Sequence, residues 1–443
     1  MASVESDLQN ALVGDRSNFR EGPPHELFRR LRSECPVHWS DGITEYPDED
    51  GFWSVTTAED VHEVSRDWET FSSEIGGFTA AKNAGLSLEM QQAMFIGMDP
   101  PKHDRLKALF QRGFTPKRIA EHEDAIRAIA TEALGRLAGR ESCDLVDDVA
   151  QPVVARVIGS FMGLTPEDDA VWARLMNAIV GAGDPDATPD GAGSVMENEV
   201  PEVFERCGRL IAERRAAPTD DLTSVLVHAE LDGEQLQDHE IVMGFLLLMA
   251  AGNDSTKATY CSGMRALMES RDQLREVVAD PTLIAGVVEE SLRMFPAFGH
   301  FARTATRDTE LHGQSIREGE KLVMWYPSSN RDESRYEDAE RFDIKRWPKR
   351  GCSPEASVSR LPSEHQAFGA GGRHYCLGTA LARLELRILF EETLARFPEI
   401  EILGTPTYLE SSFANQMKTL PVRLSPVPPG GEHLDVVDGV TLA

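Results

Sequence analysis

The sequence predicts a mainly α-helical protein with a smaller β region. Apolar residues recur at helical spacing through the segment 379–397, which indicates a helix with one buried face. A second segment, 241–260, begins with an unbroken apolar run, which is typical of a helix buried on all sides. Only a few short segments have strand character, and no repeat or long low-complexity linker divides the 443 residues.

Short strands and one helix are expected in the first hundred residues. The segments PVHW (36–39) and GFWSVT (51–56) have the composition of short strands. Residues 57–71 are expected to form a helix, with Thr57 as its N-cap. Residues 72–97 contain several glycines and few periodic signals, so we expect a mobile loop region there.

Helices are expected to continue from residue 98 to residue 240. The segment 98–119 begins with a Pro-Pro pair, a common helix start, and places His103 and Lys107 on one face. In isolation, these two side chains could either form a solvated face or bind an anion. Residues 120–240 are mostly helical by pattern, but the Gly-, Pro- and Asp-rich stretch 181–193 interrupts them and indicates a flexible connection.

The apolar helix expected over 241–260 becomes polar in its middle. Gly252 would cost about 1 kcal/mol there relative to alanine. Four polar residues follow it in the same helix: Asn253, Asp254, Ser255 and Thr256. The Ser255 hydroxyl could bond back to the carbonyl of Ala251 and open the helix locally. Polar capping at a helix end is the simpler explanation, but an acid and an alcohol are rare inside so apolar a helix, so we favour a functional role.

A glycine-rich loop, FGAGGRHYCLG at 368–378, brings Cys376 to the start of the C-terminal helix. Backbone N–H groups and the helix dipole favour an anion there, so we expect a lowered thiol pKa and easy ligation of a metal. The glycines would let a large flat group such as a haem lie against the backbone. Two alternatives stay open. The cysteine could be a buried structural residue, or it could bind zinc with Cys352, His365 and His374, although close paired ligands are missing.

Glu290 and Arg293 lie three residues apart on a predicted helix. Alone, such a pair would be a surface ion pair worth roughly a few tenths of a kcal/mol. Strand character returns after Pro296, at 297–303 and again at 323–326.

Four of these motifs, in the same order along the chain, resemble the cytochrome P450 family. The cysteine segment matches the family's haem-binding loop, Gly-x-(His/Arg)-x-Cys-x-Gly. Residues 251–255 match its oxygen-activation motif of a small residue, Gly, any residue, an acid and an alcohol. Glu290 and Arg293 match its Glu-x-x-Arg pair. His103 and Lys107 match a His and an Arg that bind the haem propionates.

Three positions depart from the family pattern. Lys107 replaces the usual arginine, so it would supply a positive charge without the bidentate fork. Ser255 replaces the usual threonine, with Thr256 beside it. The aromatic residue usual seven positions before the cysteine is Gly369, and Phe368 stands one position further back.

The resemblance implies a single-domain cytochrome P450 fold over residues 21–425, with a flexible N-terminus at 1–20 and a tail at 426–443. It implies haem b (iron protoporphyrin IX) as the cofactor, with Cys376 as the axial ligand of the iron. The other residues expected around the haem are His103, Lys107, Ala251, Gly252, Arg303, Phe368, Gly369, His374 and Gly378. The segment 181–193 would lie between the two helices that cover the substrate entrance and could act as a lid.

The same resemblance implies that Asp254, Ser255 and Thr256 are catalytic. Splitting dioxygen needs protons, delivered in a site that is otherwise dry. Asp254 would feed these protons, Ser255 would hydrogen-bond the oxygen, and Gly252 would leave room for it.

The remaining family positions are structural or border the substrate. Glu290 and Arg293 would form a buried salt bridge with Arg341, with Arg346 as the alternative third member. The expected pocket residues are Met249, Ala297, Phe298, His300 and Phe413.

Composition restricts the partners and the location. Lys+Arg 45 against Asp+Glu 74 gives a formal charge of −29, which opposes nucleic-acid binding. The N-terminus lacks the pattern of a signal peptide, and the longest apolar run, 241–251, is shorter than the roughly 20 residues of a spanning helix. Six cysteines are scattered without paired spacing, which fits a reducing cytoplasm. We therefore expect a cytoplasmic protein without a membrane span.

From the resemblance we expect a monomeric monooxygenase that inserts one atom of O2 into a hydrophobic small molecule. Fold-level analogy favours hydroxylation of a terpenoid, steroid or branched-lipid substrate. A tailoring enzyme of secondary metabolism, a peroxide-driven enzyme and a non-catalytic haem sensor are the alternatives.

The electrons are expected to come from a ferredoxin and a ferredoxin reductase, because the chain has no flavin or nicotinamide fingerprint. Basic residues shortly before the cysteine loop would suit an acidic ferredoxin, or would simply be solvated loop charges. These residues are Lys345, Arg346, Lys349, Arg350 and Arg360.

Overall fold

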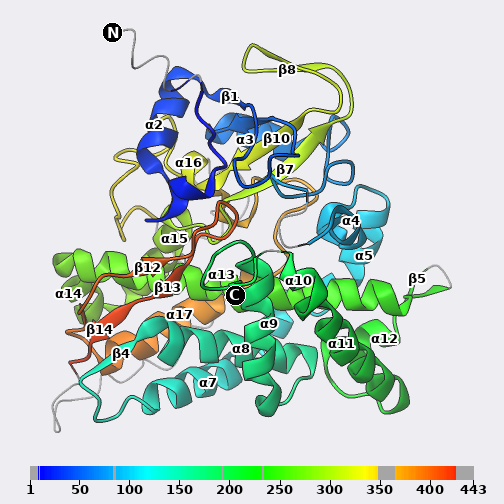
Figure 1. Cartoon of the computed structure of the whole chain (residues 1–443). Coiled ribbons are helices and arrows are strands. Elements are labelled where there is room, and N and C mark those ends of the chain that lie inside the picture. The colour runs from blue at the N-terminus through cyan, green and yellow to red at the C-terminus, as the bar shows by residue number, and fades with distance from the viewer. Residues whose placement is uncertain are drawn as a thin grey trace.

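Helices make up the larger part of the molecule, and the main β-sheet lies to one side of them (Figure 1). The computed structural model describes residues 8, 10–82, 86–191, 193–231, 234–347 and 365–425. In this part of the chain the prediction of a mainly α-helical fold with a smaller β region is confirmed. No helix among the described residues is long and apolar enough to cross a membrane.

Most of the helices lie between residues 102 and 396. They are α5 (Lys102–Gln111), α6 (Pro116–Ala120), α7 (Glu123–Gly135), α8 (Gln151–Met162), α9 (Asp169–Val180), α10 (Ser194–Glu197), α11 (Glu199–Ala216), α12 (Leu222–Val227), α13 (Asp238–Glu269), α14 (Arg271–Ala279), α15 (Ile284–Met294) and α17 (Thr379–Arg396). A π-helical turn, Val146–Ala150, leads into α8. Four further helices are α2 (His25–Glu34), α3 (Ala58–Arg66), α4 (Leu88–Ala93) and α16 (Tyr326–Ser329).

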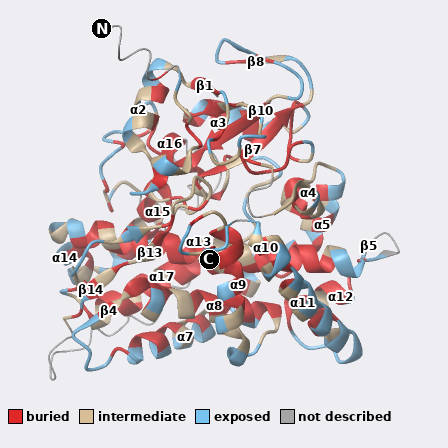
Figure 2. Cartoon of the chain, viewed as in Figure 1, coloured by how far each residue is buried: buried red, intermediate tan, exposed pale blue. Residues whose placement is uncertain are grey.

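Helix α13 crosses the centre of the helical part, and most of its residues are buried (Figures 1 and 2). It contacts α8, α9, α15 and α17. A capping box starts it, in which the side chains of Gln237 and Glu240 each accept from the other residue's backbone N–H. The predicted buried helix is therefore confirmed, and it continues through the polar residues 253–256 as far as Glu269.

Five strands form the main sheet, in the order β1-β2-β10-β7-β3. Their bounds are Val37–Ser40 for β1, Phe52–Val55 for β2, Phe71–Ser72 for β3, His300–Ala305 for β7 and Lys321–Trp325 for β10. Strand β10 pairs in parallel with β2 and antiparallel with β7. Side chains alternate along β7, so His300 and Ala302 project from one face and Phe301 and Arg303 from the other.

The remaining strands form small pairs and one three-stranded sheet. They are β4 (Ser142–Asp144), β5 (Glu230–Leu231), β6 (Glu234–Gln235), β8 (Thr309–Leu311), β9 (Gln314–Ile316), β11 (Glu401–Ile402), β12 (Thr407–Tyr408), β13 (Met417–Thr419) and β14 (Pro421–Arg423). The three-stranded sheet has the order β11-β14-β4.

The helix predicted over 57–71 is shorter than expected. Thr57 is its N-cap, as predicted, and accepts from the backbone N–H of Asp60. The helix ends at Arg66, because a turn follows in which the Asp67 carboxylate accepts from the backbone N–H of Thr70 (3.2 Å). This turn lets the chain enter the sheet directly as β3.

Two other boundaries differ from the prediction. The loop expected over 72–97 contains helix α4, which Ser87 caps by accepting from the backbone N–H of Met90 (3.3 Å). The strand expected from residue 297 begins at His300, because the backbone of 297–299 bonds instead to the segment 413–415.

The predicted break at 181–193 is confirmed, but its first half is firmly anchored. The Asp184 side chain is fully buried and accepts from the backbone N–H groups of Asp186 (2.8 Å) and Glu410 (2.8 Å). The ammonium of Lys418 lies 3.2 Å from the same carboxylate. The expectation of a flexible connection is therefore wrong for residues 181–188, which are held against the segment around residue 410.

Candidate active site

Cys376 lies at the end of a tight loop just before α17. Its backbone N–H donates to the carbonyl of Phe368 (2.9 Å). Gly369 and Gly372 have φ values of 91° and 80°, which favour glycine, and a Cβ on Gly372 would lie 2.7 Å from the carbonyl oxygen of Ser65. The glycines therefore let the loop fold back tightly and pack against the end of α3.

The surroundings of the Cys376 thiol raise its pKa. Burial is the largest cause, and it outweighs the backbone N–H of Gly378, the Lys107 ammonium and the Thr379 hydroxyl, which all lower the pKa. The predicted lowering of the pKa is therefore wrong for the thiol alone. The residue nevertheless keeps exposed surface, so it borders a space inside the protein. A metal cation in that space would favour the thiolate.

A buried arginine near this loop has no acidic partner within the part of the chain that the structure describes. Arg303 is 3% exposed, and after burial it is the main cause of the lowered pKa of His374. Among the described residues, its guanidinium has one hydrogen-bond acceptor, the carbonyl of Ala302 (2.7 Å). A buried cation without a counter-charge is costly, so this position suits a carboxylate on a bound group.

Two histidines and a lysine lie together beside the loop, as predicted. The ring centroids of His103 and His374 are 4.2 Å apart, and burial lowers the pKa of both rings. The Lys107 ammonium donates to the carbonyls of Tyr375 (2.7 Å) and Arg373. Helix α5 thus brings basic side chains to the same edge of the site as Arg303.

A cavity lined mainly by apolar side chains adjoins α13 and β7. Its empty volume, including the opening to solvent, is about 1180 Å³. Three predicted pocket residues, Phe298, His300 and Phe413, line it together with Ala251. No sequence pattern indicated most of the other apolar lining residues, among them Phe78, Leu86, Met94, Ile179, Leu247 and Phe301.

Two predicted pocket residues do not line this cavity. Met249 is 1% exposed and stands two residues before Ala251, which is roughly 200° further round the helix. Ala297 is also absent from the lining, and its carbonyl accepts from the backbone N–H of Asn415 (2.8 Å). The prediction is therefore wrong for Met249 and Ala297.

Gly252 has a different role from the predicted one. A Cβ at this position would lie 2.7 Å from Cγ1 of Ile158 on α8. The missing side chain therefore lets α13 approach α8, whereas the neighbouring Ala251 is the one that lines the cavity. The expectation that Gly252 leaves room for dioxygen is not supported by this arrangement.

His300 connects two walls of the cavity. Its Nδ1 donates to the carbonyl of Ser412 (3.0 Å), and its Nε2 accepts from the backbone N–H of Ala80 (3.1 Å). Burial lowers the pKa of His300 to about 4, so the ring is neutral at pH 7 and suited to one donor and one acceptor. Phe413, in the wall that His300 holds, packs edge-on against the ring at 5.5 Å.

Asp254 is enclosed by polar side chains from three helices. Its Oδ1 accepts from the Lys257 ammonium (2.8 Å) and its Oδ2 from the side-chain amide of Asn253 (3.2 Å). Lys257 also donates to Gln151 on α8 (2.8 Å) and to Asn177 on α9 (2.9 Å). Gln151 and Asn177 are partly exposed, so this network connects Asp254 with the protein surface. No motif in the sequence indicated Gln151, Asn177 or Lys257.

The two hydroxyl residues of the motif face different neighbours. Ser255 donates to the carbonyl of Ala251 (2.7 Å), as predicted, and the helix remains continuous there. Thr256 is buried and hydrogen-bonds the carboxyl group of Glu385 on α17. Burial raises the pKa of Glu385 to about 8, so this carboxyl is mostly protonated at pH 7. Ser255 therefore lies one turn after a cavity residue, whereas Thr256 points towards α17.

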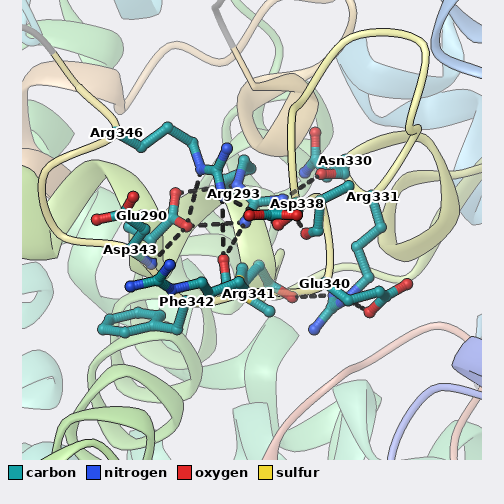
Figure 3. Close-up of polar contacts among 12 residues, drawn as sticks. Glu290, Arg293, Asn330, Arg331, Asp338, Glu340, Arg341, Phe342, Asp343 and Arg346 are labelled. Atoms are coloured by element: carbon teal, nitrogen blue, oxygen red, sulfur yellow. Dashed lines mark hydrogen bonds and ion pairs between the residues drawn. The ribbon is translucent and has the colours of Figure 1, made fainter.

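Glu290 and Arg293 form a fully buried ion pair (Figure 3). Arg293 donates to both carboxylate oxygens of Glu290, at 2.8 and 2.9 Å. The third member is the alternative residue Arg346, whose Nε donates to Glu290 (3.1 Å). Arg341 contributes only its carbonyl oxygen, which accepts from Arg293 and Arg346 (both 3.2 Å). The prediction of Arg341 as the ion-pair partner is therefore wrong.

The zinc alternative has no support in the described part of the chain. No group of three or more His, Cys, Asp or Glu side chains that could hold a metal ion is present there. His365 pairs with Glu289 (3.2 Å), and His374 bonds to Ser73 (3.1 Å). Cys352 lies outside the described residues.

The residues around Cys376 fit a haem. The Cys376 thiol keeps exposed surface, and two cations for which the described residues supply no acidic partner, Arg303 and Lys107, stand at the edge of the same site. These features define a haem-thiolate protein as the class. Comparison with known proteins agrees, because the model of the family "Cytochrome P450" matches residues 191–403.

Relatives along most of the chain identify the family. A steroid C26-monooxygenase of Mycobacterium tuberculosis is 33% identical, and the alignment covers 95% of this chain and 98% of the relative. A methyl-branched lipid omega-hydroxylase of Mycobacterium bovis is 34% identical over 90% of both chains. A Mycobacterium marinum cytochrome P450 in complex with pseudoionone has the same fold, with a TM-score of 0.84, 34% identity, and coverage of 93% of this chain and 97% of that one.

The chain belongs to the cytochrome P450 family. It is a monooxygenase with haem b as its cofactor and with a small molecule and O2 as substrates. The predicted family, enzyme class and cofactor are thereby confirmed. Because the chain is a monooxygenase, the alternative of a non-catalytic haem sensor is set aside.

Proposed function

We propose that this monooxygenase hydroxylates an apolar small molecule of the terpenoid, steroid or branched-lipid type. The observation that carries the proposal is the apolar lining of the cavity, to which Phe298, Phe301 and Phe413 contribute aromatic rings. Buried aromatic and aliphatic surface binds hydrocarbon skeletons through the hydrophobic effect. Relatives named for steroid and methyl-branched lipid oxidation support the same range of substrates.

We further propose that Cys376 would ligate the haem iron and that basic residues would hold the haem propionates. Arg303 and Lys107 would supply charge-assisted hydrogen bonds to the carboxylates, and the His103 and His374 rings would supply neutral N–H donors. When bound, the haem supplies the redox chemistry that activates dioxygen, and electron donation from the thiolate favours O–O cleavage. Phe368 would supply the aromatic ring of the loop. Its side chain is buried, and the Arg383 guanidinium lies over the ring, 4.7 Å from the centroid.

We assign the proton supply to Asp254. Its oxygens accept from Lys257 and Asn253, so a proton could reach the carboxylate along the network that opens at Gln151 and Asn177. Asp254 follows the cavity residue Ala250 by four positions and shares its helix face. Ser255, with its own hydrogen donated to Ala251, keeps its oxygen lone pairs available as acceptors in the dry site.

We also propose a ferredoxin and a ferredoxin reductase as electron donors, on the absence of flavin and nicotinamide fingerprints from the sequence. The suggested basic patch gives this proposal little support. Lys345 pairs with Glu276 (2.6 Å) and Arg346 with Glu290 (3.1 Å). The other three members, Lys349, Arg350 and Arg360, lie outside the described residues. We propose in addition that the protein is monomeric and cytoplasmic and that residues 21–425 form one domain.

The test is the absorption spectrum of the reduced protein under carbon monoxide, followed by titration with steroids and terpenoids. A strongly red-shifted haem band and a low-to-high-spin change on adding an apolar ligand are expected. Cys376→Ser should abolish both the band and hydroxylation, whereas Cys35→Ser, at a half-buried cysteine elsewhere, should leave them unchanged. Normal hydroxylation by the Cys376→Ser protein would refute the assignment.

A further inference from the structure

Charged side chains stand at one place in the mainly apolar cavity wall. Of the lining residues, Arg16, Glu45 and Glu410 carry full charges. Arg16 Nε lies 3.9 Å from Glu45 and 3.8 Å from Glu410, and Arg20 Nε lies 3.6 Å from Glu410. We call Arg16, Arg20, Glu45 and Glu410 the mouth cluster, because the side chains of Arg16, Glu45 and Glu410 are about one-quarter to one-third exposed.

The mouth cluster is held in place by its surroundings. The backbone N–H of Glu410 donates to the buried carboxylate of Asp184 (2.8 Å), which fixes that segment. The guanidinium of Arg16 donates through Nη1 to the carbonyl of Gly183, and its backbone N–H donates to Glu45 (3.3 Å). Segments from four distant parts of the chain therefore converge here, and the charged groups are positioned before any ligand binds.

Part of the hydrogen-bonding capacity of the cluster is unused. At 3.8–3.9 Å the Arg16 Nε is beyond hydrogen-bond distance from both carboxylates. In the part of the chain that the structure describes, Nη1 is the one guanidinium nitrogen of Arg16 with a hydrogen-bond acceptor, and the Glu410 carboxylate accepts no hydrogen bond. Tyr46 lines the same cavity and can offer its hydroxyl. Donors and an acceptor thus face the cavity side by side.

The charges of the cluster decide what kind of group it can bind. Two guanidinium groups and two carboxylates leave no net charge. A ligand carboxylate would meet Glu45 and Glu410, and a ligand ammonium would meet Arg16 and Arg20, so both would be partly repelled. A hydroxyl group can donate to Glu410 and accept from Arg16 at the same time, without desolvating a new charge.

We propose that the mouth cluster binds a neutral hydroxyl group at one end of an apolar substrate. The rest of the skeleton then lies along the apolar wall, which includes Leu247, Ala251 and Phe413. The end without the hydroxyl is the one presented to the oxygen-activation motif on α13. This inference rests on the proposed function, since it assigns a substrate end group and a position of attack to the same cavity.

The test compares three ligands with one carbon skeleton, farnesol, β-farnesene and farnesoic acid, by spin-state titration and calorimetry of the holoenzyme at pH 7.5. Farnesol should bind at least about tenfold more tightly than either of the others, the size expected for hydrogen bonds to charged groups. Arg16→Met and Glu410→Gln should each reduce farnesol affinity about tenfold and leave β-farnesene affinity unchanged. Arg29→Met, at an exposed arginine on α2, is the matched control and should change nothing.

Several results would overturn the inference. Equal affinity for farnesol and β-farnesene in the wild-type protein, or tightest binding of farnesoic acid, would show that the cluster does not select a neutral hydroxyl group. Equal weakening of all ligands by Arg16→Met would show that the cluster only holds the cavity walls. A protein with an intact red-shifted carbon monoxide band and no discrimination refutes this inference alone, whereas the absence of that band refutes the proposed function.

Discussion

Two acid–base pairs with the same spacing along a helix are buried in this molecule, and they differ in what surrounds them. On α15, the Glu290 and Arg293 side chains are both 0% exposed and lie 2.8 Å apart. On α13, the Asp254 and Lys257 side chains are 4% and 5% exposed and also lie 2.8 Å apart. Spacing, burial and distance therefore do not distinguish the two pairs.

The difference lies in the cation and in its other partners. Arg293 holds Glu290 with two parallel hydrogen bonds and donates to the backbone carbonyls of Asn330 and Ala339 (both 2.8 Å). Lys257 offers a point charge, and its other partners are the side-chain amides of Gln151 and Asn177. A planar fork bonded to backbone is rigid, whereas an ammonium among side chains can exchange partners. The first pair thus suits a scaffold and the second a carboxylate that must move protons.

Replacing Arg293 by lysine should give the largest effect. Lysine cannot form the bidentate pair, so Glu290 and several loop carbonyls lose partners, and we expect a loss of about 3–5 kcal/mol in the free energy of unfolding. Urea denaturation measures it. The matched control is Arg275→Lys in the exposed pair with Asp272, 64% and 97% exposed, which should change stability by less than about 0.5 kcal/mol. Similar losses in both variants would contradict the comparison.

Asp254→Asn should separate catalysis from folding. Asparagine keeps an acceptor for Lys257 but cannot pass on a proton, so we expect product formation to fall about 100-fold. Haem content and the carbon monoxide spectrum should remain as in the wild-type protein, and the solvent isotope effect on turnover should increase. Asp272→Asn, at an exposed acid, serves as the control. Unchanged turnover would mean that the network around Asp254 is only structural.

Glu385 offers a third case, a buried carboxyl group without a nearby cation. Its pKa in the folded protein is about 8, against an ordinary value of 4.5, so protonation stabilises the fold. That contribution is complete below about pH 4.5 and is lost as the pH rises through about 8. Glu385→Gln should therefore become more stable relative to the wild-type protein between pH 5.5 and 8.5, by about 3 kcal/mol. Parallel stability curves in urea for the two proteins would refute this.

The smallest expected effect on stability concerns Arg341 and Arg346. Arg346→Ala removes a side chain that bonds to buried Glu290, and we expect a loss of about 1 kcal/mol. Arg341→Ala should cost less than about 0.5 kcal/mol, because that residue takes part through its carbonyl oxygen. Thermal unfolding of the two variants side by side measures the difference. A larger loss for Arg341→Ala would restore it as the ion-pair partner.

The sequence predicted those contacts correctly that join residues close together along the chain. The bond from Ser255 to Ala251 spans one helical turn, and the Glu290–Arg293 spacing brings two side chains together on any helix. These features need no knowledge of the tertiary fold. The helix after Cys376 is present as predicted, but the expectation of one buried face is wrong, because consecutive residues such as Leu384, Glu385 and Leu386 are all buried.

Tertiary contacts account for what the sequence did not reveal. Lys257 meets Gln151 and Asn177 across 106 and 80 residues, and no local pattern relates those positions. The choice between Arg341 and Arg346 depends on the path of a loop around Glu290. The pKa of Cys376 was mispredicted because the helix N-terminus is a local feature, whereas burial is set by the whole fold.

Gly252 and Ala251 are neighbours in one motif, yet helix packing limits the side chain at one position and the cavity limits it at the other. Any side chain at residue 252 would push against Ile158 and separate α13 from α8, so the packing of two helices restricts that position to glycine. Residue 251 lines the cavity, so a larger side chain there would reduce the space for a ligand. Substrate preference can therefore be altered at residue 251, whereas a change at residue 252 would disturb the packing of α13 on α8.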